Sequence, residues 1–320
     1  MNAWLLLVTA YLIFRPSGAS AISFVLAILL FIPAADAREL KEVDWGKHRH
    51  DRFDIEPKEV MRDYGSFIVS FDSADDDNGD GTADSWAIPV WVMHEVRRVT
   101  VPCIKTIRRP KWFTDKGLAQ QRIAPYDATY QYSRKWRDNH PDWYERGHLA
   151  SKLLVERMGP EAAWNTFTLL NAVPQRRNFN KGPWFYLEIM TGAWAQRYGW
   201  VWIAAGPIIV DGKPSGHIGQ GSEIPAAIPD ALFKIVARQA SGTDIPEVLA
   251  FIYPQVGPGY TANPPISPSR FLVSVSEVEQ LTGLNFFSKL TPDQQSKFES
   301  TVATALWPVE KEDYIEACRP

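Results

Sequence analysis

The stretch Tyr144–Ala150, which reads YERGHLA, opens the part of the sequence that decides the fold. It is followed by Thr166–Gln175 (TFTLLNAVPQ) and by Asn178–Glu188 (NFNKGPWFYLE). Together these segments hold an Arg-Gly-His, two asparagines in loop-like settings and a carboxylate beyond the second asparagine. A base, a cation and oxygen ligands for a hard metal ion are the parts that hydrolysis of a phosphodiester requires.

His148 is the candidate general base. The pKa of a free imidazole is about 6.5, so this side chain can accept a proton from water at neutral pH. Gly147 has no side chain, which lets the backbone and a substrate approach each other beside the base.

Asn180 precedes a helical pattern, where an asparagine side chain usually caps backbone amides. In the functional interpretation its carbonyl oxygen instead binds Mg²⁺, an ion that keeps most of its waters and takes few protein ligands. On an ideal helix, at roughly 100° per residue, Glu188 lies about 80° from Asn180, so both side chains can flank one helix edge. Glu188 is then placed to act on the metal through water.

This arrangement resembles the DNA/RNA non-specific endonuclease family, the ββα-metal nucleases that include secreted bacterial sugar-non-specific nucleases and mitochondrial endonuclease G. The family motif is Asp-Arg-Gly-His, then Phe-x-x-x-Asn-x-x-Pro-Gln, then Asn-x-x-x-Trp-x-x-x-Glu. The matching positions in this chain are Glu145, Arg146, Gly147, His148, Phe167, Asn171, Pro174, Gln175, Asn180, Trp184 and Glu188. The departure is Glu145, where the family has Asp, and it changes how the motif is braced.

The resemblance, which covers roughly residues 64 to 290, implies a role for each matching residue. His148 is the general base, Asn180 binds Mg²⁺ or Mn²⁺ directly, and Glu188 supports the metal through water. Arg146 and Asn171 are placed at the phosphate. The implied fold is α+β, the ββα-metal nuclease fold, with a central antiparallel sheet flanked by helices.

The resemblance also implies the partners and the products. DNA and RNA are the expected substrates, with no small-molecule organic cofactor, and the products carry 5′-phosphate and 3′-hydroxyl ends. The sequence does not indicate an oligomeric state.

A basic segment lies just before this motif, although the net charge of the whole chain is -3. Between Arg97 and Arg137 there are eleven Lys and Arg against two acidic residues, with aromatic residues interleaved. Sequence-independent binding of phosphates requires such a track. A solvated face whose aromatic residues are core is the alternative. Arg109 resembles a further phosphate-binding arginine of the family, so we expect it to bind substrate.

Composition and the N-terminus set the wider frame. The chain of 320 residues is 45% hydrophobic and 22% charged, which is typical of a soluble globular protein. Residues 1–37 hold two apolar runs, each shorter than the roughly 18 to 20 residues that span a membrane, and end in an Ala-x-Ala-like site. They predict a cleavable signal peptide and export to the periplasm or beyond, with an uncleaved membrane anchor as the alternative.

Behind this segment we expect a linker at residues 38–60, the endonuclease domain at residues 61–310 and a C-terminal tail at residues 311–320. The chain has two cysteines, Cys103 and Cys318, which fit one disulfide in an exported protein. Two unpaired buried thiols are the alternative.

An acidic loop in residues 72–84 separates two predicted strands, Phe67–Phe71 and Ile88–Met93. Its candidate calcium ligands are Asp76, Asn78, Asp80 and Asp84. Their spacing, with Gly81 at the turn, matches short Ca²⁺ loops, but the usual twelfth-position glutamate is replaced by Ala87. An exposed hairpin loop that binds no Ca²⁺ is the alternative.

The second half of the chain predicts a helix and further strands. An apolar stripe after Asn180 predicts a helix that ends at Gly199. The run Trp200–Ala205 predicts a buried strand, and Ile228–Val236 and Val248–Tyr253 predict two more. A helix with a serine cap is expected to end at Gly283.

The leading functional hypothesis is an exported, Mg²⁺-dependent endonuclease that cuts DNA and RNA without strong sequence preference. One alternative is a catalytically silent nucleic-acid-binding or envelope-interaction protein on the same scaffold. Another is a phosphodiesterase that acts on small or lipid phosphates.

Overall fold

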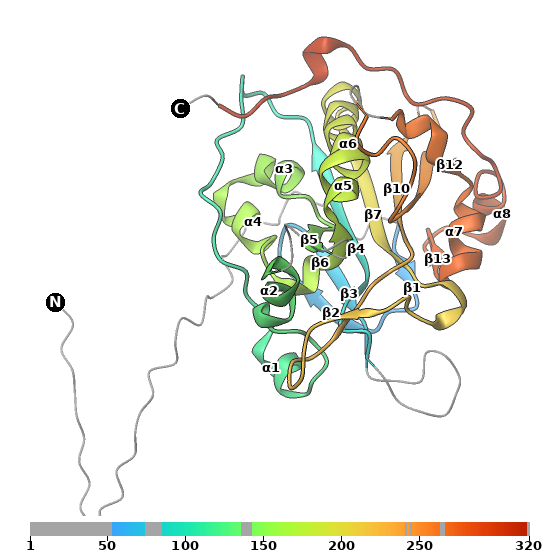
Figure 1. Cartoon of the computed structure of the whole chain (residues 1–320). Helices are drawn as coiled ribbons and strands as arrows, with labels where there is room; N and C mark the ends of the chain where they lie inside the picture. Colours follow the sequence, from blue (N-terminus) through green and yellow to red (C-terminus); the bar gives the residue numbers. More distant parts are fainter. Residues whose placement is uncertain are drawn as a thin grey trace, which may run out of the picture. The chain divides into compact units, whose positions relative to one another are not determined.

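A computed structural model describes residues 53–73, 85–135, 143–240, 242–243, 245–262 and 266–318 (Figure 1). The N-terminal segment 1–37 and the four candidate calcium ligands lie outside these residues, so the predictions made for them stay predictions. Within the described ranges no helix combines the length and the apolar character needed to cross a membrane.

The centre of the fold is a seven-stranded antiparallel sheet in the order β12-β11-β10-β7-β4-β3-β2. Its strands are β2 (Val60–Asp63), β3 (Ile68–Phe71), β4 (Pro89–Arg97), β7 (Trp200–Ile208), β10 (Ala231–Gln239), β11 (Pro246–Pro254) and β12 (Leu272–Val273). The four long strands are near-continuous hydrophobic runs because both faces of the sheet are covered. The predicted α+β fold with a central antiparallel sheet is confirmed.

Alternate residues of each central strand face opposite sides of this sheet. On β7, for example, Ile203 belongs to one apolar cluster, whereas Trp202 and Ala204 belong to the other. Neighbouring positions of β10 divide in the same way, with Leu232 on the first side and Phe233 on the second. We call these sides the ribbon face and the cap face.

The cap face is covered by segments from the two ends of the described chain. They are β1 (Ile55–Glu56), α7 (Val275–Thr282), β13 (Asn285–Phe286) and α8 (Pro292–Gln295). Helix α7 begins at the predicted serine cap, Ser274, and ends at Gly283 in the left-handed conformation.

Residues 53–60, which we expected in a linker, take part in this cover. Phe53 and Ile55 are buried in the cap-face cluster, and β1 pairs with β13. Two-residue strands leave no periodic signal, so only a partner more than two hundred residues away along the chain reveals them.

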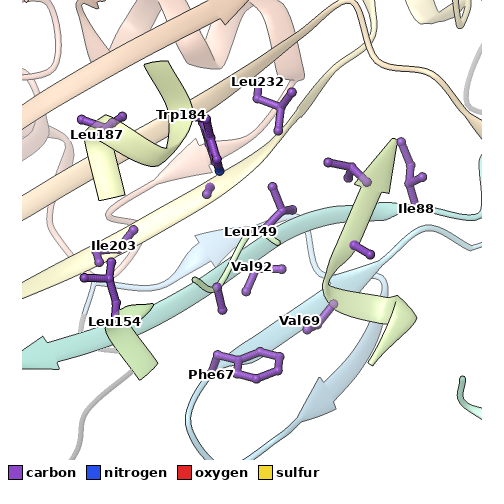
Figure 2. Close-up of a cluster of buried hydrophobic side chains, with 14 of the residues drawn as sticks. Phe67, Val69, Ile88, Val92, Leu149, Leu154, Trp184, Leu187, Ile203 and Leu232 are labelled. Atoms are coloured by element: carbon purple, nitrogen blue, oxygen red, sulfur yellow. The ribbon is translucent and has the colours of Figure 1, made fainter. Parts of the chain in front are cut away.

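The ribbon face carries most of the helices. They are α1 (Lys116–Gln120), α2 (Asp127–Lys135), α3 (Lys152–Val155), α4 (Pro160–Asn165), α5 (Arg177–Phe179) and α6 (Phe185–Tyr198), with short 3-10 turns η1 (Glu156–Met158) and η2 (Leu169–Asn171). Figure 2 shows the core beneath them, where Leu154, Trp184 and Leu187 meet Val92 and Ile203 of the sheet.

A two-stranded antiparallel ribbon also lies on this face. Strands β5 (Tyr144–His148) and β6 (Ala172–Arg176) pair with Gly147 opposite Val173, and the chain then enters α5, the π-helix η3 (Asn180–Trp184) and α6. Two antiparallel strands followed by a helix form the ββα unit that the family resemblance implies. A second small ribbon joins β8 (His217–Ile218) to β9 (Ala226–Ala227).

The C-terminal region returns across the ribbon side of the molecule. Trp307 packs in the ribbon-face core, and its carbonyl accepts a hydrogen bond of 3.0 Å from the Trp194 indole. Beyond the 3-10 turn η6 (Lys311–Asp313), Ala317 forms a bridge with Ile104. Two further 3-10 turns, η4 (Val210–Gly212) and η5 (Pro268–Phe271), lie earlier in the chain. Cys103 and Cys318 form a disulfide, which decides between the two alternatives for these cysteines.

Candidate active site

A groove with a volume of about 1160 Å³ opens along the ribbon. Five of the six predicted site residues line it. His148, Asn180 and Glu188 all do, together with Arg146 and Arg109. The sixth predicted residue, Asn171, does not. Strand β5, helix η3 and helix α6 therefore bring the candidate base and the candidate metal ligands to one cavity, in agreement with the spacing argument.

His148 ends strand β5 and is held by aromatic packing. Its ring lies 4.6 Å from the Trp112 ring and meets the edge of Phe167 at 5.1 Å, centroid to centroid. Its backbone carbonyl accepts a hydrogen bond from the Trp184 indole at 3.3 Å. The Nε2 atom is buried and has no hydrogen-bond partner in the part of the chain that the structure describes, so Nδ1 is the nitrogen that the groove can reach.

This environment keeps the imidazole neutral. Burial lowers the pKa of His148 to about 3, and the positive charges of Arg109 and Lys152 lower it further in the same direction. At neutral pH the ring therefore has a lone pair free to accept a proton.

Gly147 is required for a reason other than the one we expected. A Cβ atom at this position would lie 2.0 Å from Cδ of Gln175, whose fully buried side chain crosses the ribbon here. The absent side chain thus makes room for the neighbouring strand and not for a substrate.

Asn171 corrects a second expectation, that it contacts the phosphate. Its side chain is fully buried, and its Oδ1 accepts a hydrogen bond from the Ala150 amide at 2.7 Å. Its Nδ2 donates to the carbonyls of Ala150 and Thr166, both at 3.0 Å. Three bonds to backbone leave no group for a ligand, so Asn171 fixes the loop that follows His148.

Asn180 is oriented by the residue that departs from the family motif. Its Nδ2 donates to Oε2 of Glu145 at 2.7 Å, and the other carboxylate oxygen of Glu145 pairs with Lys181 at 3.1 Å. Because the amide nitrogen is committed, the side-chain oxygen of Asn180 is the atom left to face a cation. Asn180 has helical backbone angles and makes no capping bond, which argues against the capping interpretation.

The segment that carries Asn180 and Glu188 is not the uninterrupted α-helix from which the angle between their side chains was derived. A π-turn spans Asn180–Trp184, Pro183 lies inside it, and Gly182 has φ -102° and ψ -111°. A Cβ on Gly182 would lie 2.4 Å from the Tyr260 carbonyl oxygen, so the kink packs directly on that loop. The two side chains reach the same groove through this kink, a geometry that helical spacing alone does not describe.

Glu188 is buried at the base of the groove. Burial raises its pKa to about 7, while Lys234 and a hydrogen bond from Ser151 act in the opposite direction. A carboxyl group in this state gains strongly from a divalent cation, which favours its ionised form.

Lys234 comes from the middle of strand β10 and is only 1% exposed. Its Nζ lies 4.1 Å from the centre of the Trp184 ring, and no hydrogen bond to it is formed within the described part of the chain. Burial lowers the pKa of Lys234, and Glu188 opposes that shift. The sheet thus places a buried cation behind the carboxylate.

Arg146 also lines the groove, but it already has an acidic partner. Its guanidinium lies 2.5 Å from Oδ1 of Asp127 and 5.5 Å from the Tyr130 ring centre. The neighbouring carboxylate fixes the guanidinium at the groove wall. The expectation that Arg146 contacts the phosphate stays a prediction.

Some charged side chains of the groove form ion pairs and others do not. Its lining contains six basic and four acidic residues. Three acidic residues are paired with basic ones: Asp127 with Arg146, Glu145 with Lys181 and Glu156 with Lys152. Arg109 is exposed and makes no ion pair within the described ranges, so its charge is open to a polyanion.

The donor set can be compared with the needs of a metal ion. An amide oxygen and one buried carboxylate suit a hard cation that keeps most of its waters. No group of three or more His, Cys, Asp or Glu side chains that could hold a metal occurs among the described residues. The residues therefore fit Mg²⁺ or Mn²⁺ at Asn180 and Glu188, and they do not fit a zinc-type site.

Two contributors were missed at the sequence level. Trp112 was noted only as one aromatic residue of the basic segment, yet it packs on the candidate base. Lys234 was placed in a strand without a role. A lysine flanked by Phe233 and Ile235 in a run of apolar residues is the signal that could have found it, because lysine is almost never buried unless paired.

Comparisons with known proteins agree with this geometry. The sequence profile of the family described as "DNA/RNA non-specific endonuclease" matches residues 58–293. The mouse protein "Nuclease EXOG, mitochondrial" is 31% identical over 154 residues, which are 46% of this chain and 40% of that protein. "Nuclease 1, mitochondrial" of Schizosaccharomyces pombe is 29% identical over 226 residues, covering 62% and 67%.

The chain spans about half the length of the curated relatives it matches. Among solved structures, a complex of EndoG with EndoGI, described as showing the mechanism of EndoG inhibition, is similar with a TM-score of 0.60. The identity is 19%, and the match covers 77% of this chain and 92% of that one, so it supports the fold alone.

Proposed function

Because the chain belongs to the DNA/RNA non-specific endonuclease family, we propose that it is an endonuclease that hydrolyses phosphodiester bonds of DNA and RNA without strong sequence preference. The observation that carries the proposal is the convergence of His148, Asn180 and Glu188 on one groove. A neutral base faces a pair of oxygen donors across a cavity with basic side chains, which suits a bound phosphate.

The residues divide the work as follows. His148 takes a proton through Nδ1 from the attacking water, since its depressed pKa keeps it neutral at physiological pH. Arg109 and Arg146 offset the charge on the phosphate oxygens. A divalent ion held by Asn180, and by Glu188 through water, would supply further neutralisation of the phosphate and of the departing oxygen. Glu145 keeps the amide of Asn180 turned in the required direction.

The direct test is a nicking assay on supercoiled plasmid and on structured RNA, with Mg²⁺, with Mn²⁺ and with EDTA. We expect cleavage of both substrates with either ion and none with EDTA. The termini are read by labelling, and 5′-phosphate products are expected. Binding of polynucleotide without cleavage in every condition would instead favour the catalytically silent alternative. Cleavage of a small diester but of no polynucleotide would favour the phosphodiesterase alternative.

The metal assignment has its own test. Titration calorimetry of the purified protein with Mn²⁺ should give one site, and Asn180→Ala should weaken binding about tenfold or more, because the only direct protein ligand is lost. Unchanged binding in this variant would move the metal elsewhere, whatever the nicking assay shows.

We further propose that the protein is exported and matures in an oxidising compartment, with residues 1–37 as a cleaved signal or a retained anchor. The disulfide between Cys103 and Cys318 supports this, since such bonds persist outside the reducing cytoplasm. Mass spectrometry of the N-terminus after fractionation of expressing cells distinguishes the two. A protein found in the cytoplasm with residue 1 intact and both thiols reduced would refute export.

A further inference from the structure

A second cavity, of about 550 Å³, lies beside the active-site groove. We call it the flank pocket; the residues used below are Trp143, Arg176, Arg177, Gln255, Gly257 and Tyr260. Its volume falls within the range of about 300 to 1,000 Å³ that is usual for sites of small ligands. Trp143 and Arg177 line both cavities, so the flank pocket and the groove share part of their wall.

The pocket has a positively charged, aromatic wall. The Arg177 guanidinium lies 4.7 Å from the Trp143 ring centre, and that of Arg176 lies 5.2 Å from the Tyr144 ring centre. Arg176 and Arg177 are the charged residues of its described lining, and no carboxylate is among them. Arg177 is exposed and forms no ion pair within the described residues.

The opposite wall is rigidly attached to the ribbon. The buried side chain of Gln255 accepts a hydrogen bond from the Arg176 amide at 3.0 Å and donates to the Pro174 carbonyl at 2.6 Å. The Tyr260 hydroxyl donates to the Pro254 carbonyl at 2.6 Å, and its ring fills the space beside Gly257. These contacts hold the pocket open in the fold itself.

The position of the pocket relates it to the scissile phosphate. Arg177 precedes Asn180 by three residues, roughly 5 Å along a helix axis. Successive nucleotides of one strand of a duplex are about 3.4 Å apart along its axis. A strand that runs along this segment with its cut phosphate at Asn180 would therefore bring a phosphate one or two nucleotides away to Arg177.

We propose that the flank pocket binds a nucleotide of the substrate strand next to the cleaved bond, with its phosphate on Arg177 and its base stacked against the Trp143 and Arg177 pair. This inference rests on the proposed nuclease function and adds a second subsite to it. Stacking and phosphate contacts do not read base edges, so the subsite adds affinity without sequence preference.

The test measures binding of a fluorescent single-stranded oligonucleotide to the full-length protein in EDTA, as a function of salt. Arg177→Ala should weaken binding about tenfold, the usual scale for a charge-assisted hydrogen bond. The slope of log K against log salt should become shallower by about 0.7, which corresponds to one phosphate of a single strand. Lys297→Ala, which removes one positive charge on an exposed residue far along the chain from both cavities, is the matched control and should change neither value.

A second variant separates stacking from charge. Trp143→Leu should weaken binding of an oligonucleotide with bases while leaving the salt slope as in the wild type, and an abasic oligonucleotide should lose this difference. Unchanged affinity and slope in Arg177→Ala overturn the subsite, as does an equal loss in the Lys297→Ala control. Loss of plasmid nicking in the wild type would overturn the nuclease proposal instead, so the two failures are distinguishable.

Discussion

Neighbouring residues of the same strands lie on opposite faces of the central sheet and pack in different environments. On the cap face, Phe233 of β10 packs against Phe286 in a cluster of apolar side chains. One residue later, on the ribbon face, Lys234 is buried behind Glu188. The ribbon side also buries the polar side chains of Asn171 and Gln175 beside the groove, whereas the buried polar side chains of Ser70 and Glu95 on the cap face do not line it.

The two faces differ in what the burial of their side chains does to the stability of the folded state. Burying apolar area stabilises the folded state directly, while a buried charge costs free energy unless a partner offsets it. The ribbon face accepts this cost because its buried groups hold the candidate base and the candidate metal ligands in place. Substitutions on the two faces should therefore separate activity from stability.

The largest expected effect is on activity alone. His148→Ala removes the general base and should lower kcat by roughly 10² to 10⁴-fold. The melting temperature should fall far less than the activity, because Nε2 of the imidazole forms no hydrogen bond within the described residues. Plasmid nicking and calorimetry measure the two quantities. Near-full activity would refute the role of this residue.

The converse is expected on the cap face. Phe233→Ala removes a fully buried ring and should lower the free energy of unfolding by about 3 to 5 kcal/mol. The kcat of the fraction that remains folded should be unchanged, since among the described residues this cluster and the groove lining have no member in common. Urea denaturation and nicking at low temperature test this. A selective loss of kcat without a loss of stability would break the distinction between the faces.

Asn171→Ala should combine both effects. It leaves three backbone groups without their partner, and each buried orphan costs about 1 to 3 kcal/mol before relaxation or entry of water. Because the loop after His148 loses its support, kcat should fall as well. A phosphate contact would instead lower activity with stability preserved, and that result would reinstate the role first expected for this residue.

Lys234→Met tests the buried cation. Its positive charge lowers the pKa of Glu188, so its removal raises that pKa further above the usual value of a glutamate. A smaller fraction of Glu188 is then ionised at pH 7, and Mn²⁺ binding at that pH should weaken but recover as the pH rises toward 9. Calorimetry between pH 6 and pH 9 follows this shift. Parallel affinity curves for variant and wild type would exclude the coupling.

The same pair gives a pH dependence of stability in the metal-free protein. The pKa of Glu188 is raised when folded, to about 7, so stability falls as the pH rises from the unfolded pKa near 4.5 through 7. The pKa of Lys234 is lowered to about 8, so stability rises again between about pH 8 and pH 10.5. In Lys234→Met the second change should be absent from the melting curves.

The smallest effect concerns Arg109. Its charge contributes to the low pKa of His148, so Arg109→Ala should raise that pKa from about 3 toward the ordinary 6.5, with burial still holding it below. NMR titration of the imidazole protons measures the change. A pKa that does not move would mean that solvent screens the exposed arginine from the ring.

Much of the site was predictable because the candidate residues match a family motif whose parts lie close together along the chain. The resemblance implies the ββα unit, in which His148 ends a strand and Asn180 and Glu188 follow on the helical segment. The central strands were equally visible, since long apolar runs such as β7 leave a strong signal. The α7 caps follow from residue types at particular positions, whereas the sequence left the pairing of the two cysteines open.

What could not be predicted depends on partners far along the chain. Asn171 looked like a loop asparagine, and only the fold shows that Ala150 and Thr166 take all its hydrogen bonds. The kink at Gly182 is set by the carbonyl of Tyr260, a residue in a distant loop. Lys234 and Glu188 are forty-six positions apart in the sequence. Residue periodicity carries no information about contacts at that separation.

The link between Cys103 and Cys318 also has a consequence for the order of synthesis. A ribosome makes the chain from its N-terminus, so Cys103 waits for 215 further residues before its partner exists. The strand bridge between Ile104 and Ala317 waits equally long. The segment that bears Arg109 and Trp112 is therefore tied down at its start only after both halves of the sheet have been made. A nascent chain thus lacks this anchor until Cys318 has been made.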